Sequence, residues 1–367
     1  MKVLQVVRQF YPSCGGMQQY VYDLCESLLL RNYKIEVLSL SYDFNTNEEY
    51  KELETLEIKE KTLKIHRVNT LGPRSFFLPK IKNLNLEQYD VIHVHGLDRF
   101  LDYFALENLI STSKRKLIFT THGGIFHSDK NLWLKKIWFK TLSKLALSQI
   151  DAVIACSKQD FEVFKNISSR VCLIENGVNL SPFKSQINKC NYNNLLYVGG
   201  FLKHKQVDIL LRWFKNLDNP SLRLNLVGDD SGKDSIENLI LNLNLSKQVK
   251  CLGRISRECL VLEYKKAGIF VSASRYEGFG LSIVEAMAAG CSLILQNNEA
   301  FQTFISSSDI GELINFKEKY SNCSSIFESS QEVKKVRSLK SQLKSKSYDW
   351  ETRVDEIVKL YPNDKIN

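Results

Sequence analysis

Short hydrophobic runs alternate along the whole chain with longer segments whose apolar positions recur at helical spacing. Such runs, bounded by glycine or polar residues, are typical of strands buried on both faces of a parallel sheet. The pattern therefore predicts an α/β protein in which strands and helices alternate. The predicted strands are 3–7, 34–40, 63–68, 90–96, 116–124, 151–157 and 171–178 in the first half, and 194–200, 222–229, 249–255, 268–274, 291–297 and 311–316 in the second.

The pattern restarts after a polar break, SPFKSQINKCNYNN, at residues 181–194. A chain of 367 residues is long enough for two domains that each bury a core. We therefore predict two doubly wound, Rossmann-like domains, 1–180 and 194–345, facing a central cleft. The last helix, within 346–367, has no predicted strand after it, and we expect it to pack back on the N-terminal domain.

Glycines and unusual polar residues follow the predicted strands. In open α/β sheets, ligands bind at the carboxyl edge, where the strands end. Two such edges facing each other would bring the groups of both halves together. These residues are Gly15 and Gly16, His93 and His95, and His122 with Gly123 and Gly124 in the first half, and Gly199 and Gly200, Gly228 and Asp229, and Glu277 with Gly278 in the second.

The stretch EGFGLSIVEAMAAG, at 277–290, places two glutamates around a glycine-rich turn and a helix that is predicted to begin near Leu281. The first N–H groups of a helix and the positive end of its dipole form an anion site. Glu277, in the turn, can accept hydrogen bonds from sugar hydroxyls, and Glu285, inside the helix, can accept both vicinal hydroxyls of a ribose. A sugar, a diphosphate and a nucleoside fit this order of contacts.

The composition is that of an ordinary globular protein, with 44% apolar and 25% charged residues. No run approaches the roughly 18 to 20 apolar residues that span a bilayer. The N-terminal MKVLQVVRQF has too short an apolar run for a secretory signal and is predicted to form the first strand. Nine cysteines without a C-x-x-C pair favour a reduced, cytoplasmic protein.

The net charge of +9 is concentrated between residues 110 and 150, where eight Lys/Arg stand against one acid, Asp129. A basic patch of this kind favours an anionic partner. Within it, NLWLKKIWFKTLSKLAL (131–147) has the apolar spacing of a helix that either lies on an anionic membrane or packs on the core with a solvated basic side. Both alternatives stay open, whereas nucleic acid is disfavoured because no binding motif accompanies the charge.

His93 and His95 share one face of a predicted strand, and together with His122 and His127 they raise the question of a metal site. We disfavour a metal, because no carboxylate lies at a convincing spacing from these histidines. The pair Asp229-Asp230 is better explained as a cap at the end of a strand. The lack of a G-x-G-x-x-G motif disfavours dinucleotide redox chemistry, and no G-x-S-x-G, P-loop or H-E-x-x-H motif is present.

The stretch SRYEGFGLSIVEAMAAG resembles the E-x7-E signature of the family-4 retaining glycosyltransferases, which have the GT-B fold. Segments of the N-terminal half are also similar to GDP-mannose-dependent α-mannosyltransferases that extend a cellobiosyl-diphospho-polyprenol in xanthan-type polysaccharide assembly. Matches to the family are QFYPSCGGMQQYVYDL, HVHGLD, THGG, VIACS, IENGVN, YVGGFLKHKQVD, LVGDD and LGRIS, and matches to the subgroup are RQFYPSCGGM, HVHGLDRFLDYFAL and THGGIFHSDKNLWLKKIWFKTL.

The resemblance implies a hexosyltransferase with an acceptor-binding N-terminal domain and a nucleotide-sugar-binding C-terminal domain. It favours transfer of mannose from GDP-mannose, with retention, onto a lipid-linked or polysaccharide-precursor acceptor, without a metal or another cofactor. A lipid-linked acceptor also favours a cytoplasmic enzyme that is peripheral on the inner face of the plasma membrane, which is an anionic surface.

The resemblance also implies site residues at the positions that match the family motifs. The implied catalytic residues are His122 beside the transferred sugar, Lys205 on the diphosphate and Glu277 on the sugar hydroxyls. The implied donor-binding residues are Gly15, Gly16, Gly200, Gly278, Phe279, Gly280, Leu281 and Glu285, the last of which binds the ribose.

The sequence departs from the family in the loop that carries the lysine. The family pattern is G-R-L-x3-K-G, whereas this chain has GGFLKHKQ from Gly199 onwards. Gly200 thus replaces an arginine and Gln206 replaces a glycine, so one cation is lost from the group that holds the diphosphate. Lys203 or His204 is a candidate replacement, and low activity is the alternative.

Three alternatives to the GDP-mannose interpretation stay open. The first is a family-4 glycosyltransferase that uses a UDP-sugar. The second is a nucleotide-sugar epimerase of the same fold, which would need no acceptor. The third, suggested by Gly200, is a non-catalytic protein that binds a nucleotide sugar without transferring or hydrolysing it.

Overall fold

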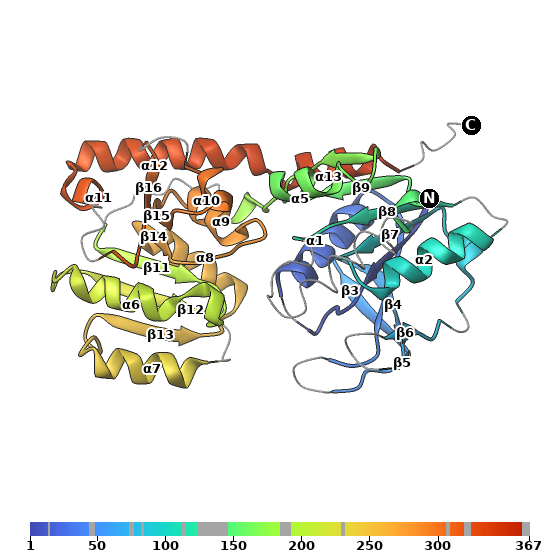
Figure 1. The fold of residues 1–367 in the computed structure, drawn as a ribbon, viewed down its shortest axis with the longest axis horizontal. Helices are drawn as coiled ribbons and strands as arrows, with labels where there is room; N and C mark the ends of the chain where they lie inside the picture. The colour runs from blue at the N-terminus through green and yellow to red at the C-terminus, as the bar shows by residue number, and fades with distance from the viewer. Residues whose placement is uncertain are drawn as a thin grey trace. The chain divides into compact units, whose positions relative to one another are not determined.

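The computed structural model describes residues 1–13, 15–43, 48–72, 77–81, 84–111, 115–123, 146–183, 192–228, 232–305, 309–318 and 324–361. The chain folds into two compact units (Figure 1). Unit 1 comprises Met1–Asn176 together with Glu351–Asn367, and unit 2 comprises Gly177–Trp350.

The boundary between the units lies between Asn176 and Gly177, before the polar break at 181–194 from which the sequence predicts the division. Val178 donates its N–H to the carbonyl of Tyr348 at 2.9 Å, and Trp350 donates its N–H to the carbonyl of Val178 at 3.1 Å. These hydrogen bonds join the start of unit 2 to its end, so residues 177–183 belong to unit 2. The chain then returns to unit 1, where Arg31 forms ion pairs with Glu351 at 2.9 Å and with Asp355 at 2.6 Å.

Unit 1 is built on an eight-stranded sheet with the order β10-β9-β8-β7-β1-β2-β4-β3. Every neighbouring pair is parallel except β3–β4. All strands that the apolar runs of the first half predict are confirmed. The strands of this sheet are β1 (Lys2–Val7), β2 (Lys34–Leu40), β3 (Leu53–Ile58), β4 (Lys61–Val68), β7 (Val91–His95), β8 (Lys116–Thr120), β9 (Ala152–Ala155) and β10 (Val171–Leu173), beside a small hairpin of β5 (Thr70–Leu71) and β6 (Leu78–Pro79).

The sequence analysis missed β3, the edge strand. Its sequence, LETLEI, alternates apolar and polar residues, and most of its side chains are exposed or half-buried. An antiparallel edge strand with one solvent-exposed face does not need the continuous apolar run that is typical of the buried parallel strands.

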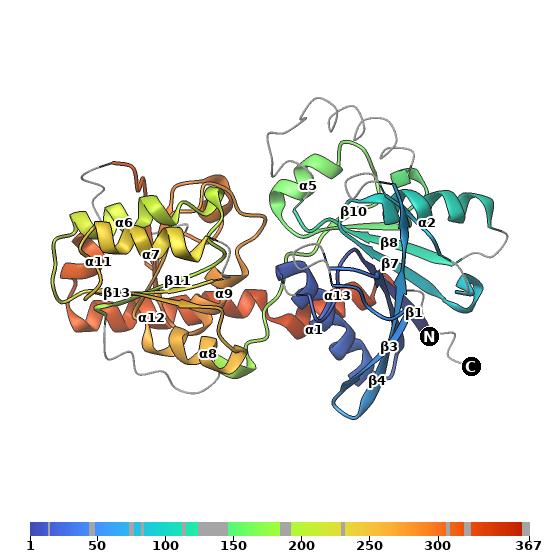
Figure 2. The ribbon, with the colours of Figure 1, turned by 90° about the horizontal axis from the view of Figure 1, so that it is seen from below.

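Helices cover both faces of the unit 1 sheet (Figure 2). On one face, Phe100 and Phe104 of α2 and Phe164 of α5 join the buried side chains of the central strands in one hydrophobic cluster. In the described ranges, the helices of unit 1 are α1 (Gly16–Leu30), α2 (Arg99–Ile110) and α5 (Lys158–Phe164), with α13 (Trp350–Val358) running in from unit 2 and a short 3-10 turn, η1 (Leu86–Gln88).

Unit 2 has a wholly parallel six-stranded sheet with the order β13-β12-β11-β14-β15-β16. Helices α6 and α7 cover one face, and α8, α9 and α12 cover the other (Figure 2). The strands are again those predicted: β11 (Asn194–Val198), β12 (Arg223–Val227), β13 (Val249–Gly253), β14 (Ile269–Ser272), β15 (Ser292–Gln296) and β16 (Gly311–Ile314). The helices are α6 (Val207–Asn216), α7 (Lys233–Asn242), α8 (Arg257–Lys266), α9 (Leu281–Ala288), α10 (Glu299–Gln302), α11 (Ser324–Glu328) and α12 (Gln331–Ser345), with 3-10 turns η2 (Ser181–Phe183), η3 (Lys203–Lys205) and η4 (Lys346–Tyr348).

In the ranges that the structure describes, no helix combines the length and the hydrophobicity that crossing a bilayer requires.

The loops after β11 and β12 approach each other closely at the carboxyl edge of unit 2. Gly199 donates its N–H to the carbonyl of Val227 at 2.9 Å. A Cβ atom built on Gly228 would lie 2.2 Å from the carbonyl oxygen of Gly199. Only glycine fits at position 228 without moving the backbone of the neighbouring loop.

We expect the substitution Gly228→Ala to lower the free energy of unfolding of unit 2 by about 1–3 kcal/mol, the usual cost of overpacking. Urea denaturation with hydrogen exchange in β11 and β12 measures the change. Gly16→Ala is the control, since no described atom lies within 4 Å of a Cβ built there, and it should change stability by less than about 0.5 kcal/mol. Equal stability of the two variants would show that the loops relax freely.

Candidate functional site

The turn between β14 and α9 carries the signature from which the sequence predicted a donor site. The helix begins at Leu281, as predicted, after Gly280 with a φ of 106°. This left-handed conformation favours glycine. Among the described residues no side chain caps α9, and its first turn contains no acid. The terminal N–H groups of α9 therefore keep their capacity to bind an anion.

Lys205 and Glu277 meet directly in front of this helix. The Nζ of Lys205 lies 2.6 Å from Oε1 of Glu277, and both side chains are less than a fifth exposed. Ser274 donates its hydroxyl to the same carboxylate oxygen at 2.9 Å. Two loops from different strands thus place a cation beside a hydrogen-bond acceptor, which is the combination that a phosphorylated sugar requires.

The loop with Lys205 is tied to the loop with Glu277 by the backbone. Arg275 donates its N–H to the carbonyl of His204 at 2.9 Å. Burial, with a smaller effect of the Lys205 charge, lowers the pKa of His204, so this histidine is neutral at pH 7. The candidate roles of Lys203 and His204 in place of the arginine stay predictions, and the exposed Arg275 lies on the adjoining loop.

The two positions where the chain departs from the family have distinct conformations. The carbonyl of Gly200 accepts the hydroxyl of Tyr197 at 2.9 Å. Gln206 has a φ of 53° and a ψ of 40°, a left-handed conformation in which glycine is favoured. The glutamine thus keeps a backbone shape that suits the family's glycine.

Glu285 lies on α9 and forms an ion pair with Arg257 of α8. The Glu285 side chain is 12% exposed and that of Arg257 is 45% exposed. A largely buried carboxylate thus pairs with an arginine whose side chain is open to solvent. Sequence analysis did not identify Arg257, because nothing local marks it as the partner of a glutamate on the next helix.

The side chains of the other predicted residues of this turn are buried or half-buried, or absent in the glycines. Phe279 is buried, and its ring packs on Phe304 and Tyr348 with centroids 5.6 Å and 5.7 Å away. Its side chain is therefore part of the core and does not face a ligand. Gly278 and Leu281 are half-buried in the same turn.

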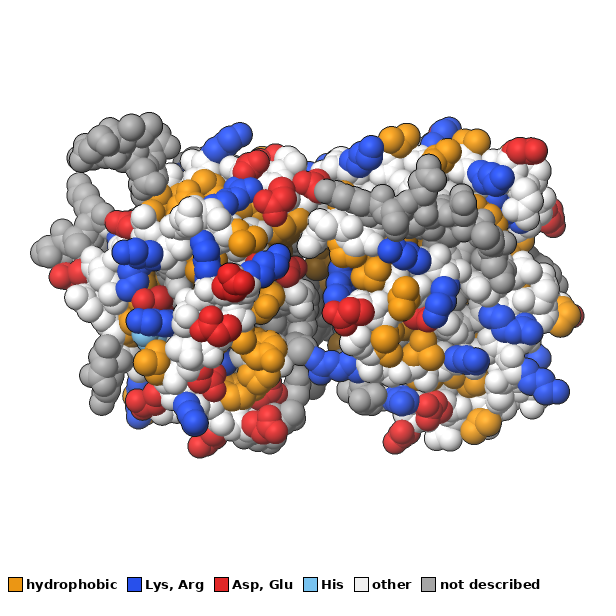
Figure 3. Space-filling model, turned by 180° about the vertical axis from the view of Figure 1, so that it is seen from behind, with side chains coloured by type: hydrophobic (Ala, Val, Ile, Leu, Met, Phe, Trp, Pro, Cys, Tyr) orange, Lys and Arg blue, Asp and Glu red, His pale blue; other side chains and the backbone are white. Residues whose placement is uncertain are grey.

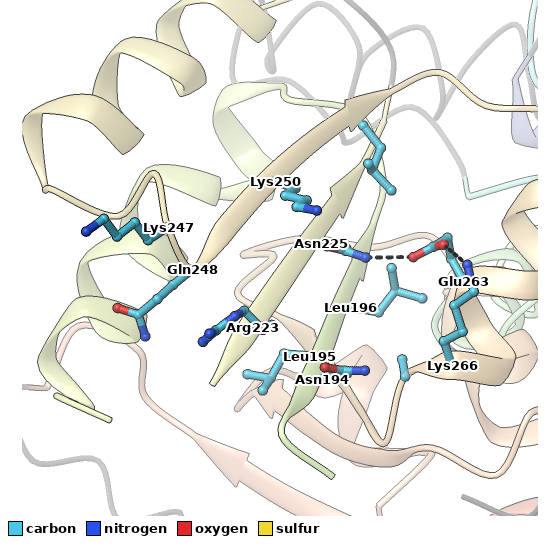
Figure 4. A pocket seen from close by; sticks show the side chains of 12 residues that line it. Asn194, Leu195, Leu196, Arg223, Asn225, Lys247, Gln248, Lys250, Glu263 and Lys266 are labelled. Atoms are coloured by element: carbon cyan, nitrogen blue, oxygen red, sulfur yellow. Dashed lines mark hydrogen bonds and ion pairs between the residues drawn. The ribbon is translucent and has the colours of Figure 1, made fainter. Parts of the chain in front are cut away.

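Unit 2 contains cavities at both edges of its sheet. A polar cavity of about 300 Å³ lies at the carboxyl edge, lined by Gln206, Arg275, Gln296, Asn297, Asn298, Asn315 and Lys317. A larger cavity of about 510 Å³ lies at the amino edge of β11, β12 and β13, beside α8 (Figure 4). There Asn225 donates to Glu263 at 2.6 Å, and Lys266 pairs with Glu263 at 2.9 Å. The larger cavity is thus at the opposite end of the strands from the predicted donor residues.

In unit 1, Gly15 and Gly16 form the exposed start of α1. No described side chain caps this helix, and its first turn lacks an acid. Like α9, it offers unpaired N–H groups to an anion. The predicted role of these glycines in binding a diphosphate stays a prediction.

A buried hydrogen-bond network joins the histidines of unit 1 to its C-terminal segment. The rings of His93 and His95 lie 4.2 Å apart on β7, and His122 follows β8. One branch of the network joins Tyr361 to His93 at 3.1 Å and His93 to Thr120 at 2.6 Å. The other branch joins Tyr361 to Gln5 at 3.2 Å, Gln5 to His95 at 2.7 Å and His95 to His122 at 3.0 Å. Gln5 and Tyr361 were not predicted, since Tyr361 is distant in sequence.

The network determines which nitrogen of each ring carries the proton. The side-chain oxygen of Gln5 only accepts, so His95 donates from Nε2. The Nδ1 of a neutral His95 is then an acceptor, and His122 must donate to it from Nε2. This leaves Nδ1 of His122 as an acceptor, 4.0 Å from the sulfur of Cys156. Both ring nitrogens of His122 thus face protein groups, and its contact with a sugar stays a prediction.

All three histidines are uncharged at neutral pH. Burial lowers the pKa of His93 and of His122 to about 3, and it lowers the pKa of His95 well below its usual range. Within the described ranges no three His, Cys, Asp or Glu side chains are placed to hold a metal ion. His127, Gly124, the pair Asp229-Asp230 and most of the basic segment 131–147 lie outside the described residues.

Asp160 anchors the loop that carries His122. It accepts hydrogen bonds from the Thr121 hydroxyl and, at 3.0 Å, from the Gly123 N–H, on either side of His122, which has a φ of 50°. Asp160 follows Ser157 at capping spacing, and the Ser157 hydroxyl accepts from the Asp160 N–H at 3.1 Å. That local signal identifies the cap of α5 but not the role of its carboxylate.

Two family models match the chain. "Glycosyltransferase Family 4" matches residues 14–182, and "Glycosyl transferases group 1" matches residues 180–345. A GDP-mannose:cellobiosyl-diphosphopolyprenol alpha-mannosyltransferase of Xanthomonas oryzae pv. oryzae is 31% identical over 323 residues, covering 86% of this chain and 83% of that protein. The protein of the same name from Komagataeibacter xylinus is 28% identical over 321 residues, covering 86% and 80%.

Solved structures share the fold over nearly the whole chain. Sucrose-phosphate synthase from Thermosynechococcus elongatus superposes with a TM-score of 0.77 at 20% identity, covering 98% of both chains. An Anabaena protein in complex with UDP and glucose superposes with a TM-score of 0.72 at 18% identity, covering 98% of both. At these identities the likeness establishes the fold and no more.

The buried histidines make the stability of unit 1 depend on pH. The folded pKa of His93 lies near 3 and the unfolded value near 6.5, so the unfolded chain binds the extra proton between these values. The stabilisation is complete above pH 6.5 and is lost as the pH falls towards 3. His93 alone should lower the free energy of unfolding by about 2 kcal/mol between pH 7 and pH 5.

Hydrogen exchange of the β7 amides at both pH values measures this loss. The variant His93→Gln keeps a donor and an acceptor but does not titrate, so its opening free energy should depend less on pH. The same pH dependence in the variant and the parent would show that the pKa of His93 is the same in the folded and the unfolded chain.

Proposed function

We propose that this chain, which belongs to the family-4 glycosyltransferases, transfers mannose from GDP-mannose, with retention, onto a lipid-linked saccharide. The chain is a hexosyltransferase of GT-B fold, with two Rossmann-like units. Its relatives named as GDP-mannose:cellobiosyl-diphosphopolyprenol alpha-mannosyltransferases support the choice of donor and acceptor.

The observation that carries the proposal is the pairing of Lys205 with Glu277 in front of the uncapped start of α9. A donor diphosphate at this point would meet the ammonium group and the helix N–H groups. The attached sugar would offer hydroxyls to the Glu277 carboxylate. Each group of a nucleotide sugar would thus meet a side chain or backbone group of matching polarity.

The reaction breaks the bond between the anomeric carbon and the diphosphate oxygen. Negative charge grows on the leaving diphosphate as the sugar becomes oxocarbenium-like, so fixed donors at that position stabilise the transition state most. Lys205 and the α9 N–H groups have that role in our proposal. An acceptor hydroxyl attacks from the side of the leaving group, and its proton passes to the departing phosphate, which gives retention.

We propose that the reaction needs no metal ion. The positive charge that a metal would otherwise supply at the diphosphate would come from Lys205, from the helix N–H groups and from Arg275 on the adjoining loop. Arg275 would take over from the arginine that Gly200 replaces. Activity that survives chelation by EDTA would support this part of the proposal.

An acceptor that is attached to a lipid stays in the bilayer. No described helix is suited to span a membrane, and we propose that the enzyme meets its acceptor as a peripheral protein on the inner face of the plasma membrane. The basic segment 131–147 is one candidate for this contact and stays a prediction from the sequence.

The test is a transfer assay with the purified chain, a cellobiosyl-diphospho-lipid acceptor, and GDP-mannose, UDP-glucose, UDP-galactose or UDP-N-acetylglucosamine as the donor. We expect α-linked mannosyl product from GDP-mannose alone. Transfer from a UDP-sugar would overturn the donor assignment. Conversion of the donor without acceptor would identify an epimerase, and donor binding without transfer or hydrolysis would identify a binding protein.

Lys205→Ala should lower kcat by roughly 10² to 10³, the effect of removing one preorganised electrostatic donor. The KM for the acceptor should change little, because the lysine acts on the diphosphate. Lys203→Ala is the matched control, since Lys203 lies in the same short turn but is exposed. Steady-state kinetics of both variants measure kcat and the KM for the acceptor. Equal losses would assign the diphosphate to Lys203 as much as to Lys205.

A further inference from the structure

Helix α12 of unit 2 turns its aliphatic side chains outward. Val333, Val336, Leu339 and Leu343 are 45%, 49%, 60% and 61% exposed, and we call these four residues the α12 stripe. A helix on the surface of a globular protein normally presents such a stripe to the core. The buried residues of α12 are instead Arg337, Ser338, Ser341 and Ser345.

The serines explain how α12 packs without its aliphatic residues. A Cβ built on Gly290, after α9, would lie 2.4 Å from the hydroxyl oxygen of Ser338, so the two segments approach closely. Ser341 donates to the carbonyl of Cys291 at 2.9 Å, and Gln342 donates to the carbonyl of Ala288 at 3.4 Å. The Gln342 amide thus binds the last carbonyl of α9, and the Ser341 hydroxyl binds a carbonyl just beyond it. The core of unit 2 therefore does not account for the α12 stripe.

Lysines border the stripe. Residues 331–346 contain six Lys/Arg and one acid, Glu332. At 100° per residue, Lys335 and Lys346 lie along one border of the stripe and Lys344 along the other. Two charged residues lie within it, Glu332 and Lys340, and Lys340 pairs with Asp309 at 3.0 Å. Along the edge of unit 2 that α12 forms, Figure 3 shows hydrophobic side chains next to lysines and arginines.

We propose that the α12 stripe seats unit 2 on an anionic lipid surface. The aliphatic side chains enter the boundary between headgroups and acyl chains, while the bordering lysines extend to the anionic headgroups. Each lysine near such a surface adds attraction that salt screens. A second copy of this chain suits the stripe poorly, because a symmetric contact would oppose two positive borders.

This inference goes beyond the proposed function, because it concerns where unit 2 docks and not which sugar is transferred. It also differs from the membrane contact that the sequence predicts at 131–147, in the other unit. Each of the two surfaces can be tested by itself.

The experiment measures co-sedimentation of the full chain with vesicles of phosphatidylcholine containing about a third phosphatidylglycerol, and with pure phosphatidylcholine. The test variant is Val336→Gln/Leu339→Gln/Leu343→Gln. The control is Leu241→Gln/Leu262→Gln, which removes two leucines of unit 2 that are 61% and 52% exposed on other helices. We expect the triple variant to bind the anionic vesicles at least about tenfold more weakly. The control should bind like the parent.

Salt-sensitive binding of the parent to anionic but not to neutral vesicles, lost in the triple variant alone, supports the proposal. Unchanged binding of the triple variant overturns it, as does loss that occurs only on charge reversal of Lys135, Lys136 and Lys140. A parent dimer that dissociates in the triple variant would assign the stripe to self-association instead. Circular dichroism shows whether the variant folds.

Transfer to a short soluble acceptor separates this proposal from the proposed reaction. The triple variant should keep that activity, because the substituted side chains lie on the exposed face of α12, whereas other residues of α12 contact α9. If the parent shows no mannosyl transfer at all but the vesicle results stand, the proposed function fails and the docking surface remains.

Discussion

Parallel strand pairing is the constraint on which the rest of this structure depends. Because neighbouring strands run in the same direction, their carboxyl ends meet at one edge in each unit, and the loops that leave them are crowded together. The crowding demands glycine where Gly228 faces the Gly199 carbonyl. It also brings Lys205, after β11, to Glu277, after β14, since these strands are neighbours in the sheet. The strand order of the sheet is therefore what brings the two side chains of the site together.

Polar side chains with little exposure find different kinds of partner in the two units. In unit 1, burial keeps three histidines neutral, and each finds its partner in a directional chain of hydrogen bonds that ends at Tyr361. In unit 2, acidic and basic side chains at the sheet edge pair with each other, as Lys205 does with Glu277 and Arg257 with Glu285. Neutral networks hold a backbone in place, whereas partly accessible charge pairs can exchange a partner for a charged ligand.

Packing also decides which side chains of a helix are exposed. The short side chains of Ser338 and Ser341 let α12 approach Gly290 and bind the carbonyl of Cys291. A larger aliphatic residue at these positions would hold the two helices apart. The aliphatic residues of α12 are therefore on its outer face, where they are available to a lipid surface. One face of α12 thus packs on the core of unit 2, and the other presents the α12 stripe to the surroundings.

The sequence by itself determined the parallel strands of both sheets, the start of α9 at Leu281 and the family, because apolar periodicity and glycine placement are local signals. The tertiary structure alone decided the edge strand β3, the unit boundary at Asn176 and the pairing of Tyr361 with His93. The periodicity of α12 predicts a helix but not which of its faces is buried. Contacts between segments far apart in the sequence depend on which elements pack together, and no local pattern of residues records that choice.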